Sequence, residues 1–235
     1  MKNEETVLSE REKILARVRE ALKIPAHVPG AHGTAPLPAS AHSPAADARS
    51  WLPKVGDSFA EQLALFQSTA AELKAEVQMV ASRDAVKAAL AKMASDGNWK
   101  RIATHKGELT DFATADLGLP ICRTEGGYDV QEMEACDAGI TECDALVAQT
   151  GSVLVTSLSA GGRGLSVLPP HHVVFARREQ LVADLPAAFA LVQKKYAPHF
   201  PSMISFITGP SRTGDIERIL VLGAHGPKKL TILCF

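Results

Sequence analysis

Helical and strand-like patterns alternate along the chain between residues 56 and 123, and this alternation restricts the possible folds more than any other feature. Helical patterns of apolar residues cover 58–77, 82–97 and 109–114, and strand-like patterns cover 77–80, 101–105 and 119–123. Ser58 and Glu61 stand at capping-box spacing, and Ser82 and Gly97 stand where a helix begins and ends. This order predicts an α/β fold in which helices flank a mostly parallel sheet.

The second half of the chain continues the pattern. Strand-like segments cover 138–141, 145–156, 173–176, 203–207 and 229–235, and a helical pattern covers 179–196. We expect 203–207 and 229–235 to complete the same sheet.

The first 55 residues differ in composition from the rest. Residues 9–22 predict an amphipathic helix, with Leu15 and Val18 on its apolar face, and Pro25 ends it. Residues 24–55 are rich in Pro, Ala, Ser and His, which is typical of a linker. We therefore predict an arm at 1–55 and an α/β domain at 56–235.

Composition excludes several classes of function. The 235 residues carry a formal net charge of -1, which provides no electrostatic basis for binding nucleic acid or anionic membrane. The polar start of the chain does not resemble a secretory signal, and no apolar run approaches the roughly 18 residues of a membrane span. We expect a cytoplasmic protein, and the sequence leaves open whether it forms a homo-oligomer.

Four cysteines are present, and none forms a Cys-x-x-Cys pair. They are Cys122, Cys136, Cys143 and Cys234. Iron–sulfur and zinc sites use tighter spacings, so we expect no metal site in this chain and interpret the cysteines as small buried apolar residues.

The segment 203–217 carries the densest chemistry. An apolar stretch leads into Gly209 and Pro210, and a short helix is expected to follow. Ser211, Arg212 and Thr213 could bind a carboxylate or phosphate at the carboxyl edge of the sheet. The acids at 215 and 217 could transfer protons; the alternative is ordinary capping of the helix by Thr213.

A second turn, 223–227, precedes the last strand-like segment. His225 stands beside Gly226 and could act as a base or a hydrogen-bond donor, although a surface histidine in a turn explains it equally well. We predict that 208–217 and His225 converge on one crevice at a rim of the sheet.

Other polar positions have two interpretations each. Thr150, Gly151 and Ser152 could donate hydrogen bonds to a ligand or form a hairpin turn. Glu142 and Asp144 are candidate acids or an ordinary strand end. The loop 159–164 lacks a nucleotide fingerprint and is interpreted as a flap. The adjacent histidines at 171 and 172 are expected to face opposite sides of a strand.

Four motifs together resemble those of the LUD-domain family. They are Thr-Gly-Ser at 150–152, Leu-Pro-Pro-His-His at 168–172, Thr-Gly-Pro-Ser-Arg-Thr-Gly-Asp-Ile-Glu at 208–217 and Gly-Ala-His-Gly-Pro at 223–227. The resemblance covers roughly residues 56–235 and implies a fold like that of ribose-5-phosphate isomerase, glucosamine-6-phosphate deaminase and the CoA transferases.

The resemblance also implies which residues form the site. His225, Asp215 and Glu217 fall on the family's signature positions, and our own hypothesis is that one of these three transfers a proton. Ligand binding is assigned to Thr150, Gly151, Ser152, Gly209, Ser211, Arg212, Thr213 and Gly226. Gln149 departs from the family pattern, which more often has an acid there.

The implied activity is a role in the oxidation of L-lactate to pyruvate, with a small carboxylate as ligand. The iron–sulfur clusters are expected in partner proteins, and no cofactor is expected in this chain. Two alternatives stay open: a stand-alone enzyme acting on a phosphorylated sugar, acyl-CoA or folate, and a non-catalytic assembly module that docks through residues 1–55.

Overall fold

The computed structural model describes residues 10–21, 23, 52–213, 221–223 and 225–235. The chain divides into two units, Met1–Ala48 and Arg49–Phe235, and each is described by itself. The predicted division after residue 55 stays a prediction.

The first unit contains helix α1, Glu10–Ala21, close to the bounds predicted from the sequence. The side chains of residues 11–20 are all exposed, and they include the apolar residues Ile14, Leu15 and Val18. In the part of the chain that the structure describes, no helix has the length and apolar character needed to cross a membrane.

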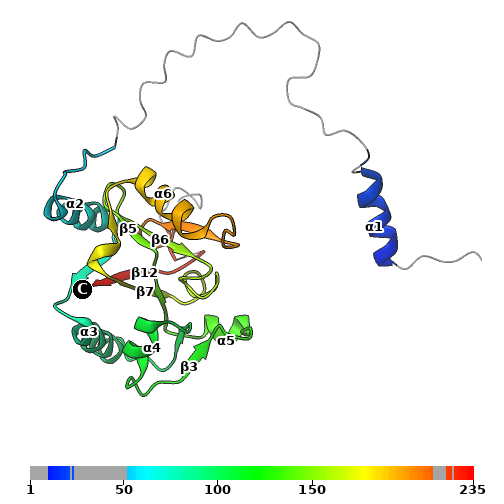
Figure 1. Ribbon diagram of the computed structural model, residues 1–235. Coiled ribbons are helices and arrows are strands. Elements are labelled where there is room, and N and C mark those ends of the chain that lie inside the picture. Colours follow the sequence, from blue (N-terminus) through cyan, green and yellow to red (C-terminus); the bar gives the residue numbers. More distant parts are fainter. Residues whose placement is uncertain (1–9, 22, 24–51, 214–220, 224) are drawn as a thin grey trace, which may run out of the picture. The chain divides into compact units, whose positions relative to one another are not determined.

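The second unit is built on a six-stranded sheet in which every neighbouring pair is parallel (Figure 1). In spatial order its strands are β1 (Glu76–Met79), β12 (Lys229–Cys234), β7 (His171–Ala176), β4 (Ala138–Glu142), β2 (Ile102–Thr104) and β3 (Ile121–Arg123). The predicted α/β fold with a mostly parallel sheet is confirmed.

A second sheet of four strands lies against the first. Its order is β8 (Leu181–Val182), β5 (Ala145–Val147), β6 (Ser152–Thr156) and β9 (Ile204–Ile207). The expectation that 203–207 completes the main sheet is therefore wrong. β9 pairs antiparallel with β6, with Leu154 opposite Phe206, because the β5–β6 hairpin leaves the main sheet and presents its own edge.

The helices cover the two sheets in layers. Helices α3 (Arg83–Asp96) and α4 (Glu108–Thr114) cover one face of the main sheet, and α6 (Leu185–Tyr196) covers the outer face of the second sheet (Figure 1). Phe66 and Ala70 of α2 (Phe59–Glu72) join one core with residues of both sheets. Helix α5 (Val130–Glu134) contributes Met133 to a smaller core beside β2 and β3.

Local signals place the helix ends. Ser58 and Glu61 form the predicted capping box of α2, and Ser82 caps α3. The helix expected over 179–196 begins later than predicted. Asp184 caps it and Pro186 stands in its first turn, whereas Leu181–Val182 forms β8 alongside β5.

The two histidines of β7 face opposite sides of the main sheet, as expected. His171 Nε2 lies 2.9 Å from Thr231 Oγ1, and its ring meets the Trp99 ring edge-on. His172 Nε2 lies 2.9 Å from Thr141 Oγ1. Burial lowers the pKa of His171 to about 4 and that of His172 to about 3, so both rings are neutral at pH 7.

These two histidines predict loss of stability in mild acid. The unfolded chain takes up protons near pH 6.5, before the folded chain does, so the stabilisation is complete above that pH and is lost as the pH falls toward 4. Each ring should lower the free energy of unfolding by up to about 1.4 kcal/mol per pH unit in this window. Urea unfolding at pH 7.0, 6.0 and 5.0 measures it.

Replacement of His171 by Gln keeps a polar side chain and removes one titrating group. We expect a shallower dependence on pH for this variant. Equal slopes for the variant and the parent chain would contradict the assignment.

Candidate functional site

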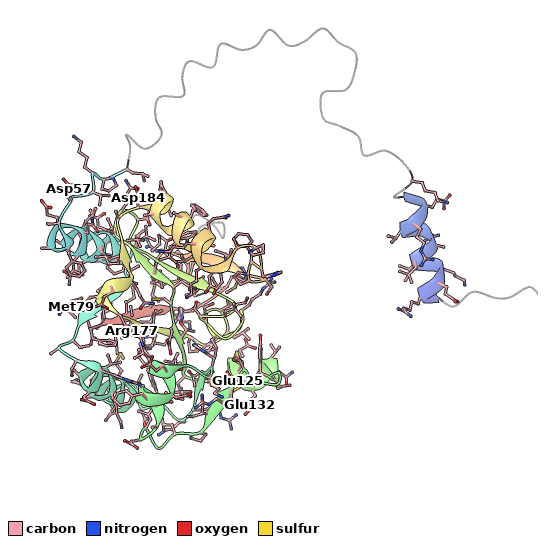
Figure 2. The ribbon with its side chains drawn as sticks, viewed as in Figure 1. Asp57, Met79, Glu125, Glu132, Arg177 and Asp184 are labelled. Atoms are coloured by element: carbon pink, nitrogen blue, oxygen red, sulfur yellow. The ribbon has the colours of Figure 1, made fainter. Side chains whose placement is uncertain are left out.

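A pocket of about 380 Å³ opens at the carboxyl edge of the main sheet, where ligands of parallel α/β proteins bind. We call it the carboxyl-edge pocket. Its polar lining includes His105 after β2, Glu142 at the end of β4, Arg177 after β7, and Lys195 and Tyr196 at the end of α6. Figure 2 labels Arg177 close to the end of β12, and its neighbour Arg178 donates its backbone N–H to Phe235 O at 2.8 Å.

His105 orders one wall of this pocket. Its Nδ1 lies 3.0 Å from Lys106 O, and the backbone N–H of Glu142 donates to its Nε2 at 3.2 Å. These partners require the tautomer that carries the proton on Nδ1. Both ring nitrogens are engaged within the protein, so His105 serves as a structural link between β2 and β4.

Glu142 connects the pocket to the start of α4. Its Oε1 accepts hydrogen bonds from the backbone N–H groups of Leu109 at 2.8 Å and Thr110 at 3.4 Å. Gly107 stands at the N-cap position of α4 without a side chain, and Glu142 supplies the missing acceptor from another strand. A side chain at Gly107 would collide with the same oxygen.

Asp144 is the most unusual group at the site, because its side chain is 0% exposed. Its Oδ1 accepts hydrogen bonds from Lys195 Nζ at 2.5 Å and from the Tyr196 hydroxyl at 2.6 Å. Its Oδ2 is buried without a hydrogen-bond partner in the described residues. Burial is the largest single influence and would raise the pKa of Asp144, but the hydrogen bonds from Lys195, Ser159 and Tyr196 and the charge of Lys195 together outweigh it, and the pKa is lowered.

Asp144 raises the pKa of both Lys195 and Tyr196, whereas burial acts on the two groups in opposite senses. Burial is the largest single influence and lowers the pKa of Lys195, but the hydrogen bond to Asp144, its negative charge and the contact with Tyr196 together outweigh burial and raise that pKa. Burial and donation to Asp144 together raise the pKa of Tyr196. Near neutral pH the site therefore holds an ammonium and a neutral phenol, both fixed on one buried oxygen.

Arg177 adds a second fixed cation to the pocket. Its Nη2 donates to Glu108 Oε2 at 2.9 Å, while Arg83 Nη1 donates to Glu108 Oε1 at 3.0 Å. With Lys106 and Lys195, three cations line the pocket beside the carboxylate of Glu142. Asp144 pairs with Lys195 and Glu108 pairs with Arg177, so an anionic ligand would be held by the N–H donors that these pairs leave free and not by an excess of positive charge.

The two loops singled out from the sequence do meet, but elsewhere. Ser211 N donates to Pro227 O at 2.8 Å, and Gly223 N donates to Ser211 O at 2.9 Å. Arg212 donates its guanidinium to Leu73 O, just before β1, and Lys228 N donates to Pro170 O at 2.8 Å, just before β7. The loops therefore lie at the amino-terminal edge of the main sheet.

The expected place at the carboxyl edge is wrong for these loops. The reason is that β9 belongs to the second sheet. The carboxyl end of β9 is therefore not at the carboxyl edge of the main sheet, and the loop that follows β9 lies at the amino-terminal edge of the main sheet. Thr213 pairs with Val221 between β10 (Arg212–Thr213) and β11 (Val221–Leu222). Asp215 and Glu217, with the predicted helix, lie outside the described residues.

The Thr-Gly-Ser turn joins the same region. Ser152 Oγ donates to Thr150 Oγ1 at 2.8 Å and lies 2.8 Å from Thr208 Oγ1. Gly151 has φ +63°, and a side chain there would come within 2.6 Å of the backbone nitrogen of Ala70. The turn thus closes the β5–β6 hairpin and approaches α2. Whether it also binds a ligand stays a prediction.

Two of the remaining residues of the predicted site, His225 and Gly226, lie around a second hollow. His225 is exposed and, with Gly226 and Lys228, lines a space of about 500 Å³ near Pro170 and Glu134. Gly209 has φ +84° and faces Leu73 O closely. The proton-transfer role of His225 and the ligand role of Gly226 and Gly209 stay predictions.

Sequence reasoning named Glu142 and Asp144 but missed other charged and polar residues of the pocket region. Arg177, Lys195 and Tyr196 belong to no motif, and two basic residues at the end of a helix are typical of a solvated surface. Lys195 differs from Lys194 in that it contacts the buried carboxylate of Asp144. This contact arises only in the tertiary structure.

We predict that Lys195→Met destabilises the chain much more than Lys194→Met. Loss of Lys195 leaves a buried carboxylate without its cation, at a cost of about 1–3 kcal/mol, whereas Lys194 is exposed and should change stability by less than about 0.5 kcal/mol. Adding Asp144→Asn to Lys195→Met should restore part of the loss. Urea unfolding of the parent chain and the three variants measures these values, and equal effects of the two lysine substitutions would contradict the assignment.

Comparison with known proteins bears on the fold and the family. Residues 57–234 match the model of the LUD domain. A crystal structure of a DUF162 family protein from Deinococcus radiodurans superposes with a TM-score of 0.57 at 23% identity, covering 75% of this chain and 98% of that one. This likeness supports the fold described above.

Curated relatives named Lactate utilization protein C are similar over part of the chain. Those of Shouchella clausii and Halalkalibacterium halodurans are 39% and 38% identical over 132 and 121 residues, or 56% and 51% of this chain. The one of Anoxybacillus flavithermus is 36% identical over 110 residues, or 47% of this chain. The matches span 58%, 53% and 49% of the relatives' own length, about half. Because the domain match extends over nearly the whole second unit, this chain belongs to the LUD-domain family.

Proposed function

We propose that this chain takes part in lactate utilization and that its carboxyl-edge pocket binds a small carboxylate. The lactate assignment is supported by the names of the relatives. The carboxylate assignment is supported by one observation above all, the ammonium of Lys195 held at the pocket by buried Asp144. A cytoplasmic location, as expected from the sequence, is part of the proposal.

The pocket has the size and donors for such a ligand. A volume of about 380 Å³ is at the lower end of ligand sites, which suits a molecule of few atoms. An ammonium carries three N–H donors, and Lys195 uses one on Asp144, so two are left for a carboxylate. The anchoring also reduces the conformational entropy that Lys195 would lose on binding.

Iron–sulfur clusters, expected from the family resemblance, fit poorly in this chain. Cluster iron binds thiolates, and burial raises the pKa of all four cysteines, that of Cys136 to about 12 and that of Cys234 to about 11. We therefore assign the clusters, and the electron acceptance that lactate oxidation requires, to partner proteins.

The ligand class is tested by calorimetric titration with propionate, L-lactate and inorganic phosphate. We expect each carboxylate to bind Lys194→Met as tightly as it binds the parent chain. Lys195→Met should weaken carboxylate binding at least tenfold, because a charge-assisted hydrogen bond is worth about 1.5–3 kcal/mol. Arg177→Met should weaken it by a smaller factor, because Glu108 already engages that side chain.

The outcomes separate the functions that the sequence left open. Tight binding of phosphate with no binding of carboxylates would favour the stand-alone enzyme on a phosphorylated substrate. Absence of binding by every anion would favour an assembly module. Circular dichroism at the titration temperature establishes that each variant is folded.

The partner assignment is tested by affinity capture of the full-length tagged chain from cells grown on L-lactate. We expect a cysteine-rich protein to be captured together with iron and acid-labile sulfide, while the chain purified alone contains neither. Stoichiometric iron and sulfide in the isolated chain would overturn the assignment.

A further inference from the structure

We infer that a second cavity, between β1 and α3, binds a neutral, planar lactam heterocycle of the size of a nucleobase. This cavity, which we call the amino-edge pocket, has a volume of about 540 Å³, against about 380 Å³ for the carboxyl-edge pocket. Two ring nitrogens without hydrogen-bond partners, on Trp99 and His171, carry the inference. The site is independent of the proposed function.

The amino-edge pocket lies where three parallel strands of the main sheet begin. Glu76 begins β1, His171 begins β7 and Lys229 begins β12, and all three residues line the pocket. Ala89 and Met93 of α3 add apolar surface to its wall. A cavity of this volume, with apolar surface and a few polar groups, has the character of a ligand site.

The charges around this pocket are paired. Lys92 Nζ lies 2.6 Å from Asp96 Oδ2, and Lys229 Nζ lies 3.5 Å from Glu76 Oε2. His171 is neutral at pH 7, because burial lowers its pKa to about 4. Two cations thus face two carboxylates, and this balance favours an uncharged ligand.

His171 presents a hydrogen-bond acceptor to the pocket. Thr231 Oγ1 donates to Glu76 Oε2 at 3.4 Å, so its only proton is committed. The same Thr231 oxygen lies 2.9 Å from His171 Nε2 and therefore accepts the Nε2 proton. The neutral ring then has no proton on Nδ1, and this nitrogen can accept a hydrogen bond from a ligand.

Trp99 presents a hydrogen-bond donor to the same pocket. Its side chain is buried, and an indole N–H in such a place usually has a partner. No residue that the structure describes accepts from Trp99 Nε1. A Cβ atom added to Gly97, which also lines the pocket, would come within 2.5 Å of Nε1, so the N–H lies at this wall.

The two nitrogens are open to solvent and close to each other. In the described part of the chain, the side-chain atoms that are fully buried without a partner are Arg83 Nε, Asp144 Oδ2 and His172 Nδ1. Trp99 Nε1 and His171 Nδ1 are not among them, so solvent reaches both through the pocket that the rings line. The ring centres are 5.5 Å apart. One small ligand can therefore contact both nitrogens.

A lactam matches this pair of nitrogens because it carries an N–H beside a C=O. The carbonyl oxygen would accept from Trp99 Nε1, and the N–H would donate to His171 Nδ1. A carboxylate has no proton for His171. The thioether of Met93 and the methyl group of Ala89 suit the face of a flat ring. Nucleobases combine these properties.

The experiment compares theobromine with caffeine, two purines that differ in a single lactam N–H, which is methylated in caffeine. We expect theobromine to bind the parent chain about fivefold more tightly than caffeine, as one net hydrogen bond allows. Trp99→Phe should weaken theobromine binding about fivefold, because it removes the indole donor. Trp51→Phe, the matched control, should leave the affinity unchanged.

A spectroscopic signal locates the bound purine. The chain has two tryptophans, so in Trp51→Phe the indole N–H signal of a proton–nitrogen correlation NMR spectrum belongs to Trp99 alone. Theobromine should shift this signal downfield, as a new hydrogen bond does.

Three results would overturn the inference. They are failure of both purines to bind, equal affinities for the two purines, and binding that leaves the Trp99 signal unmoved. The comparison of the two purines in the parent chain decides the lactam contact even where Trp99→Phe does not fold.

Discussion

An all-parallel sheet must be covered on both faces, since its strands are apolar on both sides, and the rest of the structure follows from this requirement. All six residues of β7 are buried. Helices α3 and α4 cover one face, and the second sheet with α2 covers the other. To build the second sheet, the chain must leave the main one, and it does so directly after β4, between Glu142 and Ala145. The carboxyl-edge pocket lies at this departure.

The departure also explains why a carboxylate is buried there. Asp144 is the residue between the two sheets, and its backbone N–H donates to Leu154 O at 2.8 Å, which places its side chain under the last turn of α6. A buried carboxylate is costly unless a cation and hydrogen bonds compensate it. Lys195 and Tyr196 supply both, so the contact that fastens α6 to the sheets also orients the ammonium that we assign to ligand binding.

The glycines that marked candidate site positions have a packing reason. Gly151 and Gly209 adopt positive φ and approach the backbone of α2 and of the residues after it, where a side chain would collide. A turn that requires glycine for a close approach to a helix has the same sequence pattern as one that requires it for a ligand. At Gly151 the pattern indicated a bulge or a close backbone approach, and the structure shows such an approach to α2. A ligand role for the turn stays a prediction.

The sequence by itself determined the class of fold and most of the longer helices and strands, because capping residues and apolar periodicity act over a few neighbouring residues. Ser58 and Ser82 cap helices in this local way, and the family motifs lie in one continuous domain match. Only the tertiary structure decided which sheet β9 joins and which of two adjacent lysines meets a buried carboxylate. Both depend on contacts between residues about 50 positions apart, such as Asp144 with Lys195 and Leu154 with Phe206, and no local pattern encodes such a contact.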